Sequence, residues 1–272
     1  MPVKDLRLET VIATAIVSAH VSGGRAMGVW DDLARELDAW GGAEKRATLW
    51  WRDDDAVEST PALTRLHDLA RTHDVTPALA VVPRDAAADL PGAALLQHGY
   101  AHTNHGQKKK AELGPERGAD AVAGELATGR RRLIDLFAAR ALPVLTPPWN
   151  RIAPAVTALL PGLGFRGLST YRARSAPEAA PGVVQVNTHV DIVDWRERRF
   201  AGDGPSVTAL VGHLADRRLG RVDAAEPTGI LTHHLVHDAP AWSFLDRLLA
   251  ATRAHPAIRW LTPAQAFGLA PA

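Results

Sequence analysis

The chain of 272 residues contains no cysteine. Disulfide bonds, thiolate nucleophiles and cysteine-ligated zinc sites are therefore excluded together. Any metal ion that the protein binds has to be held by histidine and carboxylate side chains. The sequence contains 12 histidines and 30 acidic residues that could do so.

Strong net charge and long apolar runs are also absent. The formal net charge is +1, so the composition does not indicate a nucleic acid or an anionic membrane as partner. No stretch approaches the roughly 20 apolar residues of a membrane span. The apolar part of residues 11–24 is short, and the charges of residues 1–10 cancel, which is untypical of a secretory signal. We expect a cytoplasmic protein, with export through residues 1–24 as the alternative.

Two signatures of common enzyme classes are missing. No GxxxxGK[ST] segment occurs, so the phosphates of a nucleotide lack that glycine-rich cradle. GLSTY at residues 167–171 lacks the second glycine of a serine-hydrolase nucleophile elbow. The sequence therefore disfavours a P-loop enzyme and a serine hydrolase.

Short apolar runs alternate with longer helical patterns from residue 47 onward. This alternation predicts an α/β fold with a largely parallel sheet. No repeat or linker divides the chain, so we expect one domain over residues 29–272 and an N-terminal extension over residues 1–28. Strands are expected at 47–51, 76–83, 93–97, 142–150, 164–171, 182–187, 229–234 and 258–262, and helices at 61–73, 119–140, 153–161, 207–218 and 242–255.

Polar side chains follow the expected strands in five places. The segments RDDD, HGYAHTNH, TPPWN, HVDIVDW and THHLVHD each lie at or just beyond the C-terminal end of an expected strand. Active sites of barrels and open α/β sheets are built at that edge. Packing alone does not explain this concentration of Asp, His, Asn and Trp. We therefore expect these five segments to form a single site.

Asp53, Asp54 and Asp55 follow an apolar run directly. Adjacent carboxylates repel one another, and their burial is costly unless they are paired or bind a cation. The functional interpretation is a metal ligand beside a general base. The structural alternative is an acidic loop that leads into the helix expected from Pro61.

His98, His102 and His105 crowd into eight positions after another apolar run. On a helical turn, the spacing of four between His98 and His102 would place both imidazoles on one face, where they could share an ion. Gly99 fits a tight turn out of the strand. His105 could be a third ligand, a partner of the ligands or a substrate contact, and a structural histidine pair is the alternative for the whole cluster.

The segments TPPWN and HVDIVDW contribute fewer titratable groups. In the first, the rigid Pro-Pro could hold a backbone N–H and the Trp149 ring against a ligand, beside Asn150, as binding of an oxyanion requires. In the second, Asp191 and Asp194 could orient a histidine, and Trp195 could stack on that histidine or on a sugar. A strand-ending turn and a surface loop are the respective alternatives.

THHLVHD places His233 and His234 at the end of an expected strand. Because strand side chains alternate between the two faces, one of the pair should point into the site and the other away from it. The inward histidine is a candidate general acid.

Taken in order, the five segments resemble those of the polysaccharide deacetylase family, the NodB-type carbohydrate esterases. The similarity is strongest to a divergent bacterial branch that carries a WWRDDD strand, and it covers roughly residues 47 to 262. The resemblance implies a distorted (β/α)7-type barrel with its site at the C-terminal ends of the strands.

The resemblance also implies roles for individual residues. In the family, a Thr-Phe-Asp-Asp-Gly motif supplies a base and then a metal ligand, so RDDDA makes Asp54 the base and Asp55 the ligand. A shift by one residue would choose Asp53 and Asp54 instead. The His-x-x-x-His motif of the family matches His98 and His102, although Gly99 stands where Ser or Thr is usual.

TPPWN resembles the Arg-Pro-x-Tyr-Gly segment of the family, which places Trp149 where a backbone N–H helps to bind the oxyanion. Thr146 replaces the arginine that pairs with the base in the family, and Arg52 or Arg151 could take its place. HVDIVDW matches the Asp-x-x-Asp-Trp segment. ILTHH resembles Leu-Leu-His-Asp, which makes His233 the candidate acid and leaves His234 where an aspartate would orient it.

The activity implied by the resemblance is metal-dependent removal of an N-acyl group, chiefly acetyl, from a carbohydrate or a related amide. Two histidines and one carboxylate suit zinc first, with cobalt, nickel, manganese or iron as alternatives. A hydrolase of a small cytoplasmic amide or imide is one alternative function. A carbohydrate-binding pseudoenzyme without turnover is another, and the oligomeric state is not indicated.

Overall fold

The structure is a computed structural model that describes residues 28–92 and 94–269. The expected N-terminal extension therefore lies outside the described residues, apart from Gly28. The short apolar segment at residues 11–24, which raised the question of export, lies outside them as well.

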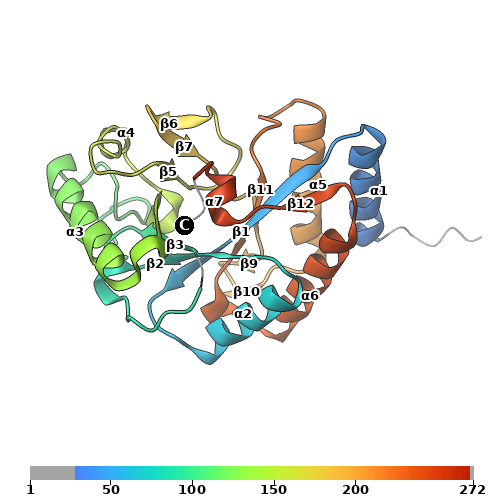
Figure 1. Ribbon diagram of the computed structural model, residues 1–272, viewed down its shortest axis with the longest axis horizontal. Coiled ribbons are helices and arrows are strands. Elements are labelled where there is room, and N and C mark those ends of the chain that lie inside the picture. The colour runs from blue at the N-terminus through green and yellow to red at the C-terminus, as the bar shows by residue number, and fades with distance from the viewer. Residues whose placement is uncertain (1–27, 93, 270–272) are drawn as a thin grey trace, which may run out of the picture.

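One large, mainly parallel sheet organises the fold (Figure 1). Its strands are β1 (Ala47–Ala56), β2 (Ala78–Val81), β3 (Ala94–His98), β4 (Ala141–Thr146), β5 (Gly167–Leu168), β6 (Glu178–Ala180), β7 (Val183–Gln185), β8 (Val190–Asp191), β11 (Thr228–Thr232) and β12 (Ile258–Trp260). They follow the order β6-β7-β5-β4-β3-β2-β1-β11-β8, and β12 pairs with the start of β1. All pairs are parallel except β6 with β7. A separate antiparallel ribbon consists of β9 (Val193–Asp194) and β10 (Arg199–Phe200).

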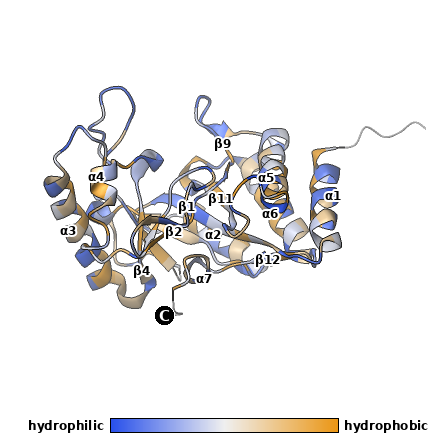
Figure 2. Ribbon diagram, turned by 90° about the horizontal axis from the view of Figure 1, so that it is seen from above, coloured by the Kyte–Doolittle hydropathy of each residue, from blue (hydrophilic) through white to orange (hydrophobic). Residues whose placement is uncertain are grey.

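Most helices cover the outer face of the sheet, while the short helix Pro263–Ala266 packs against the apolar cluster on the inner face. The helices are α1 (Val29–Gly42), α2 (Pro61–Thr72), α3 (Ala119–Phe137), α4 (Pro154–Thr157), α5 (Asp203–Arg218), α6 (Ala239–Ala254) and α7 (Pro263–Ala266), with 3-10 turns η1 (Pro83–Asp85), η2 (Ala138–Arg140), η3 (Pro148–Asn150) and η4 (His234–Val236). Figures 1 and 2 show α1 packed alongside α5 and well separated from α3. Across the described part of the chain, no helix has the length and apolar character needed to cross a membrane.

The sheet curls into an incomplete barrel. Beyond β5, Thr188 N donates to Thr170 O at 3.1 Å, and Tyr171 forms a parallel bridge with Thr188. These contacts bring the chain after β5 against the chain that enters β8, although β5 and β8 are far apart in the strand order. The structure thus has the α/β fold and largely parallel sheet expected from the sequence.

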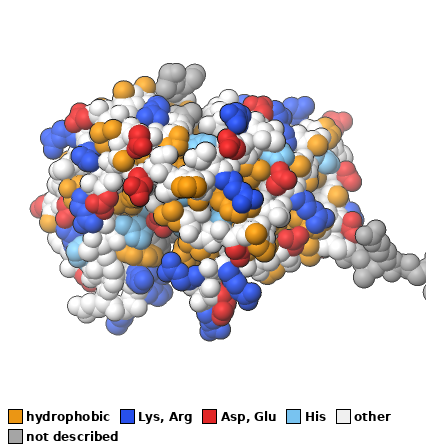
Figure 3. Space-filling model, turned by 90° about the horizontal axis from the view of Figure 1, so that it is seen from below, with side chains coloured by type: hydrophobic (Ala, Val, Ile, Leu, Met, Phe, Trp, Pro, Cys, Tyr) orange, Lys and Arg blue, Asp and Glu red, His pale blue; other side chains and the backbone are white. Residues whose placement is uncertain are grey.

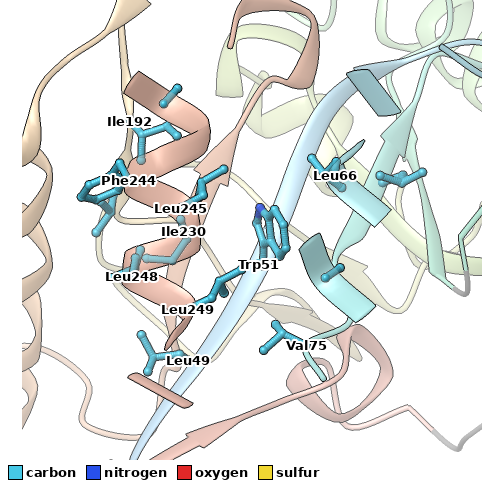
Figure 4. Packing of buried hydrophobic residues seen from close by; sticks show 14 of the residues in the cluster. Leu49, Trp51, Leu66, Val75, Ile192, Ile230, Phe244, Leu245, Leu248 and Leu249 are labelled. Atoms are coloured by element: carbon cyan, nitrogen blue, oxygen red, sulfur yellow. The ribbon is translucent and has the colours of Figure 1, made fainter. Parts of the chain in front are cut away.

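Consecutive tryptophans in β1 fill the two sides of the sheet. Trp50 lies inside the barrel, where it packs edge-on against Phe267 at 5.5 Å between ring centroids. Trp51 points outward into the larger apolar cluster with Leu66 and Leu249, as Figure 4 shows. Both rings are buried, so β1 is a central strand with no solvent-exposed face. Burial on both faces is typical of parallel sheets.

Several of the expected strand boundaries were wrong. The first strand does not end at residue 51 but continues through the aspartates to Ala56, because each of their side chains finds a partner in the fold. The strand expected at 164–171 shortens to β5.

Residues 162–167 have the spacing GxGxxG, which is found in dinucleotide-binding sites. Here they lead from α4 into β5, whereas a dinucleotide site needs a strand followed by a helix.

A buried pair of histidines supports the start of β11. His189 and His213 stack with ring centroids 3.5 Å apart and planes 17° apart, and His189 Nε2 lies 3.4 Å from Glu226 Oε2. Gly229 N–H donates to His189 Nδ1 at 3.0 Å. The ligand atoms of His189, His213 and Glu226 lie within 4.8 Å of one another. An ion bound by imidazole must lie in the plane of the ring, and two nearly parallel stacked planes cannot share one. The pair is therefore structural.

This pair predicts loss of stability in acid. Burial, followed by the nearby His189 and Arg217, lowers the pKa of His213 to about 2 from 6.5. Below pH 6.5 the unfolded chain takes up a proton that the folded chain excludes, so His213 alone reduces the unfolding free energy by up to about 1.4 kcal/mol per pH unit. His213→Gln should flatten the slope of unfolding free energy between pH 6 and pH 4, measured by urea titration.

His105→Gln serves as the control because that ring is exposed. It should leave the slope unchanged. An equal slope in wild type and His213→Gln would show that His213 is protonated in the folded state.

Candidate metal centre

The aspartate triplet sits on a distortion of β1. Asp53 lies opposite Leu79 of β2, but Ala56 lies opposite Val81, so three steps on β1 face two on β2. Such a bulge re-aims side chains. Asp55 takes a φ of 71°, which is strained for a residue with a Cβ atom. As a result, the three carboxylates point in three directions.

Asp54 points into the barrel and pairs with Arg52. Arg52 Nε donates to Asp54 Oδ1 at 2.8 Å and Nη2 to Oδ2 at 3.0 Å, and both side chains are buried. The guanidinium also donates to Ser169 Oγ at 2.6 Å and to Asn150 Oδ1 at 2.8 Å. A bidentate pair of this kind fixes the carboxylate in orientation. Arg52 and Arg151 were both candidates for the arginine that pairs with Asp54. The structure shows that Arg52, from the same strand, forms this pair.

Asp55 faces the two histidines at the end of β3. Its Oδ1 lies 3.2 Å from His98 Nε2 and 3.2 Å from His102 Nε2. His98 Nδ1 donates to Thr146 O at 3.0 Å, which leaves Nε2 with its lone pair towards the carboxylate. Metal-binding histidines are commonly held in this way through the second nitrogen.

The two histidines do not share a helical turn, contrary to expectation. Residues 99–111 form no helix, and Gly99 and His102 both lie in the left-handed region, with φ values of 57° and 53°. Glu112, which is fully buried, accepts the backbone N–H groups of Tyr100 and Ala101 at 3.2 and 2.7 Å. The loop is therefore folded around a buried carboxylate that brings His102 back over His98.

Glu112 also explains the glycine at position 99. A Cβ atom there would lie 2.0 Å from Glu112 Oε2 and 2.7 Å from Pro148 Cδ. No local pattern indicates this role, because Glu112 lies two residues after a run of three lysines and fits a solvent-exposed segment equally well.

The residues around Asp55 fit a divalent cation. Two atoms that each lie about 2.1 Å from a shared ion are about 3.0 to 3.4 Å apart, and the observed separations are 3.2 Å. Asp55 Oδ1 is buried and accepts no hydrogen bond within the described structure. Burial opposes the charged form of Asp55, yet the close approach of His98 and the nearby imidazoles of His233 and His102 lower its pKa overall. The carboxylate therefore stays charged and needs a positive partner.

The electrostatics of His98 support the same conclusion. Burial lowers the pKa of this imidazole, but the closeness of the Asp55 carboxylate and the charges of Asp54 and Asp55 outweigh it and raise the pKa. The pocket thus stabilises positive charge at His98, whereas burial and the charge of His98 lower the pKa of His102. A divalent cation held by the same three residues would supply that charge.

The segment TPPWN closes one side of this centre. The Trp149 ring lies 4.4 Å from the His102 ring, centroid to centroid. Trp149 and the next residue, Asn150, have φ values of 55° and 56°. Consecutive non-glycine residues in this region store strain, which often marks functional sites. Asn150 is anchored through its bond with Arg52.

His233 approaches from the opposite side. Its Nε2 lies 4.0 Å from Asp54 Oδ2, and its ring contacts Trp195 edge-on at 4.5 Å. Trp195 Nε1 donates to Asp191 Oδ2 at 2.7 Å, so Asp191 holds the indole rather than the imidazole. Burial raises the pKa of Asp191, although the charge of His233 and the bond from Trp195 act against it.

The His234 side chain does not bond the His233 ring, contrary to the expectation from the resemblance. Its Nδ1 lies 2.5 Å from Asp53 Oδ1, on the outer face of the sheet. The alternation of side chains along the strand separates the two neighbours. Asp53 is therefore remote from the histidine pair, which disfavours the register that made Asp53 the base and Asp54 the ligand.

Three other candidates lie outside the centre. Asp194 accepts the N–H of Arg196 at 2.9 Å in an exposed turn and orients no histidine among the described residues. His105 is exposed, and the ligand group contains Asp55, His98 and His102 without it. Arg151 reaches Lys110 O at 2.6 Å instead of Asp54.

Charge is mixed rather than concentrated on the face of the molecule seen from below in Figure 3. On the face seen in Figure 3, Lys and Arg side chains alternate with Asp and Glu, and histidine side chains reach the surface between them. Recognition therefore depends on the local chemistry of the candidate site.

Comparison with known proteins shows the fold but not the activity. No protein-family profile and no curated sequence matches the chain. Among solved structures, it is similar to the Bc1960 peptidoglycan N-acetylglucosamine deacetylase, with 17% identity, 83% of this chain and 90% of that chain covered, and a TM-score of 0.53. It is also similar to a candidate polysaccharide deacetylase from Mycobacterium smegmatis, with 16% identity, 84% and 93% coverage, and a TM-score of 0.55.

A third similar structure carries a different description. It is BA3943, a CE4 family pseudoenzyme from Bacillus anthracis, with 13% identity, 82% of this chain and 66% of that chain covered, and a TM-score of 0.51. At these identities, the likeness establishes a fold shared with polysaccharide deacetylases over most of the chain.

The three aspartates should differ in their effect on metal content. Asp55→Asn should reduce bound zinc from about one ion per chain to near zero, because a neutral amide is a poor ligand for a divalent cation. Asp53→Asn and Asp54→Asn should retain the ion, since neither carboxylate belongs to the ligand group. Elemental analysis after zinc loading and desalting measures each case.

The double variant His98→Ala/His102→Ala should behave like Asp55→Asn. Equal zinc content in all of these proteins and the wild type would show that the ion binds elsewhere.

Proposed function

We propose that this protein is a metal-dependent hydrolase that removes an N-acyl group, chiefly acetyl, from a carbohydrate or a related amide. The fold shared with polysaccharide deacetylases supports the class of reaction. The observation that carries the proposal is the charged, buried Asp55 oxygen placed 3.2 Å from two imidazole nitrogens, beside a second carboxylate held by Arg52.

The arrangement divides the work of amide hydrolysis between the chain's residues. A divalent ion, when bound by Asp55, His98 and His102, would supply Lewis-acid activation of water and of the acyl carbonyl. Zinc suits this donor set first, and cobalt, nickel, manganese and iron are alternatives.

Asp54 is the proposed general base. Its carboxylate lies beside the ligand group, and Arg52 holds both of its oxygens, so it is oriented to accept the proton that water loses as it adds to the acyl carbon. The backbone near Trp149 is the proposed donor to the carbonyl oxygen, where negative charge develops.

His233 is the proposed general acid. Its Nε2 lies 4.0 Å from Asp54 Oδ2, so a substrate amide bound next to both side chains could receive the proton on nitrogen as the carbon–nitrogen bond breaks. The products are a carboxylate and a free amine. Trp195 is 47% exposed next to His233, and an exposed indole face offers a stacking surface for a sugar ring.

A pseudoenzyme is the second candidate, since one of the similar structures is a CE4 pseudoenzyme and a mutant of that protein has restored activity. The missing arginine of the TPPWN segment and the altered ILTHH segment favour this candidate. The Arg52–Asp54 pair weakens the first of these two arguments, because the carboxylate has its guanidinium partner from another position.

Asp54→Asn provides the test of the proposed reaction. Zinc-loaded wild type should release acetate from N-acetylated chitooligosaccharides, and Asp54→Asn should lose about 10²- to 10⁴-fold in kcat, the usual contribution of a general base, with its zinc retained. The kcat of wild type and variant is measured from acetate release, and mass analysis identifies the amine product.

Asp216→Asn is a matched control, because Asp216 pairs with Arg221 at the surface. Turnover of small amides but not of oligosaccharides would shift the proposal to the small-amide alternative. Oligosaccharide binding without product from any acylated substrate would favour the pseudoenzyme.

A further inference from the structure

Asp53 is buried on the outer face of β1, away from the candidate metal centre. Its Oδ2 accepts from Thr232 Oγ1 at 2.6 Å and from His234 N at 3.0 Å, and its Oδ1 bonds His234 Nδ1 at 2.5 Å. Trp51 Nε1 donates to the same Thr232 hydroxyl at 2.8 Å. One carboxylate therefore binds the residue before His233 and the residue after it.

Few direct contacts fix the orientation of the His233 ring. Its Nδ1 is buried and has no hydrogen-bond partner in the part of the chain that the structure describes. General acids and bases of the histidine type usually have the second ring nitrogen fixed by a carboxylate or a carbonyl. Here the orientation of the ring depends on the edge contact with Trp195 and on the backbone from which it projects.

We infer that Asp53 and His234 form a buried clamp that positions His233 for proton transfer. This inference rests on the proposed function of His233 as general acid. Asp53 binds the Thr232 hydroxyl on one side of His233 and the backbone N–H and ring of His234 on the other, from behind the sheet, so it acts without touching the substrate. The clamp also accounts for the third carboxylate of the triplet, to which neither metal binding nor base catalysis gives a role.

The pairing in the sheet explains how the clamp reaches His233. Asp53 is the register partner of Thr232 in the parallel pair of β1 and β11. The next residue of the β11 segment, His233, turns inward, and His234 begins η4 with its backbone N–H directed at Asp53. Loss of the carboxylate would release the start of η4 and let the His233 ring move relative to Asp54.

The dependence on the leaving group separates this role from a general structural one. An amide needs a proton on its leaving nitrogen, whereas 4-nitrophenolate leaves from 4-nitrophenyl acetate without one. Asp53→Asn should therefore reduce kcat for an N-acetylated chitooligosaccharide by roughly tenfold to a hundredfold, the usual effect of losing a supporting contact. It should leave hydrolysis of 4-nitrophenyl acetate and zinc content near wild type.

Four further variants complete the experiment. His233→Ala should show the same selective loss, to a larger extent. His234→Asn keeps a donor near the position of Nδ1 and should retain more amide activity than His234→Ala. Asp246→Asn breaks a carboxylate–histidine pair at the surface, with His73 at 2.7 Å, and should leave the ratio of amide to ester activity unchanged.

A crystal structure of zinc-loaded Asp53→Asn tests the clamp independently of turnover. The His233 Nε2–Asp54 Oδ2 separation of 4.0 Å should change or the ring should become disordered, while Asp55, His98 and His102 keep their places. An unmoved His233 overturns the clamp, as does an equal loss of amide and ester hydrolysis. If wild type hydrolyses neither substrate, the proposed function fails, and the position of His233 still decides whether the clamp exists. If Asp53→Asn does not fold, His234→Asn and His234→Ala provide the same comparison.

Discussion

Three adjacent carboxylates can share a buried strand only if each has its own positive partner or set of hydrogen-bond donors. Burial of an unpaired carboxylate costs several kcal/mol, and neighbouring like charges add to that cost. The protein meets this constraint by distributing the triplet. Asp53 is bound by His234 and Thr232, Asp54 by Arg52, and Asp55 by His98 and His102. These pairings join β1 to β3, to the loop that follows β3, and to β11 with the turn after it.

The distribution depends on backbone conformations that are individually unfavourable. Asp55, His102, Trp149 and Asn150 all have positive φ values, and they come from three separate segments that meet at the candidate site. Strain of about 1–3 kcal/mol at each such residue persists only where the surroundings enforce it. Here the enforcing contacts are the β1 bulge, the buried Glu112 under the histidine loop, and the bond between Arg52 and Asn150. The strained backbone aims the side chains at one point.

The two histidine clusters show that proximity of ligand atoms is a weak criterion for a metal site. His189, His213 and Glu226 are as close together as Asp55, His98 and His102. In the first group the His189 and His213 rings are stacked, and the backbone N–H of Gly229 donates to His189 Nδ1. In the second group the nitrogen lone pairs converge on a carboxylate that accepts no hydrogen bond from the described residues. The direction of the lone pairs, and not the separation of the atoms, distinguishes the two.

The sequence by itself determined the fold class, the edge of the sheet at which the site lies, and the residue types that build it. These features depend on local patterns: apolar runs that alternate with helical periods, and polar residues that follow the runs. The opposite orientations of His233 and His234 also follow from strand periodicity. The absence of cysteine restricted any metal site to histidine and carboxylate ligands.

Only the tertiary structure decided which partner and which role each of the three aspartates has. The bulge at Asp55 depends on pairing with β2, and no local pattern in RDDD announces it. The partner of Asp54 is Arg52 rather than Arg151 because Ser169 and Asn150, distant in sequence, complete the guanidinium's bonds inside the barrel. Glu112 became a support for the histidine loop through burial that its lysine-rich neighbourhood does not suggest. Each of these depends on contacts between segments far apart in the chain, and such contacts exist only once the sheet has closed around them.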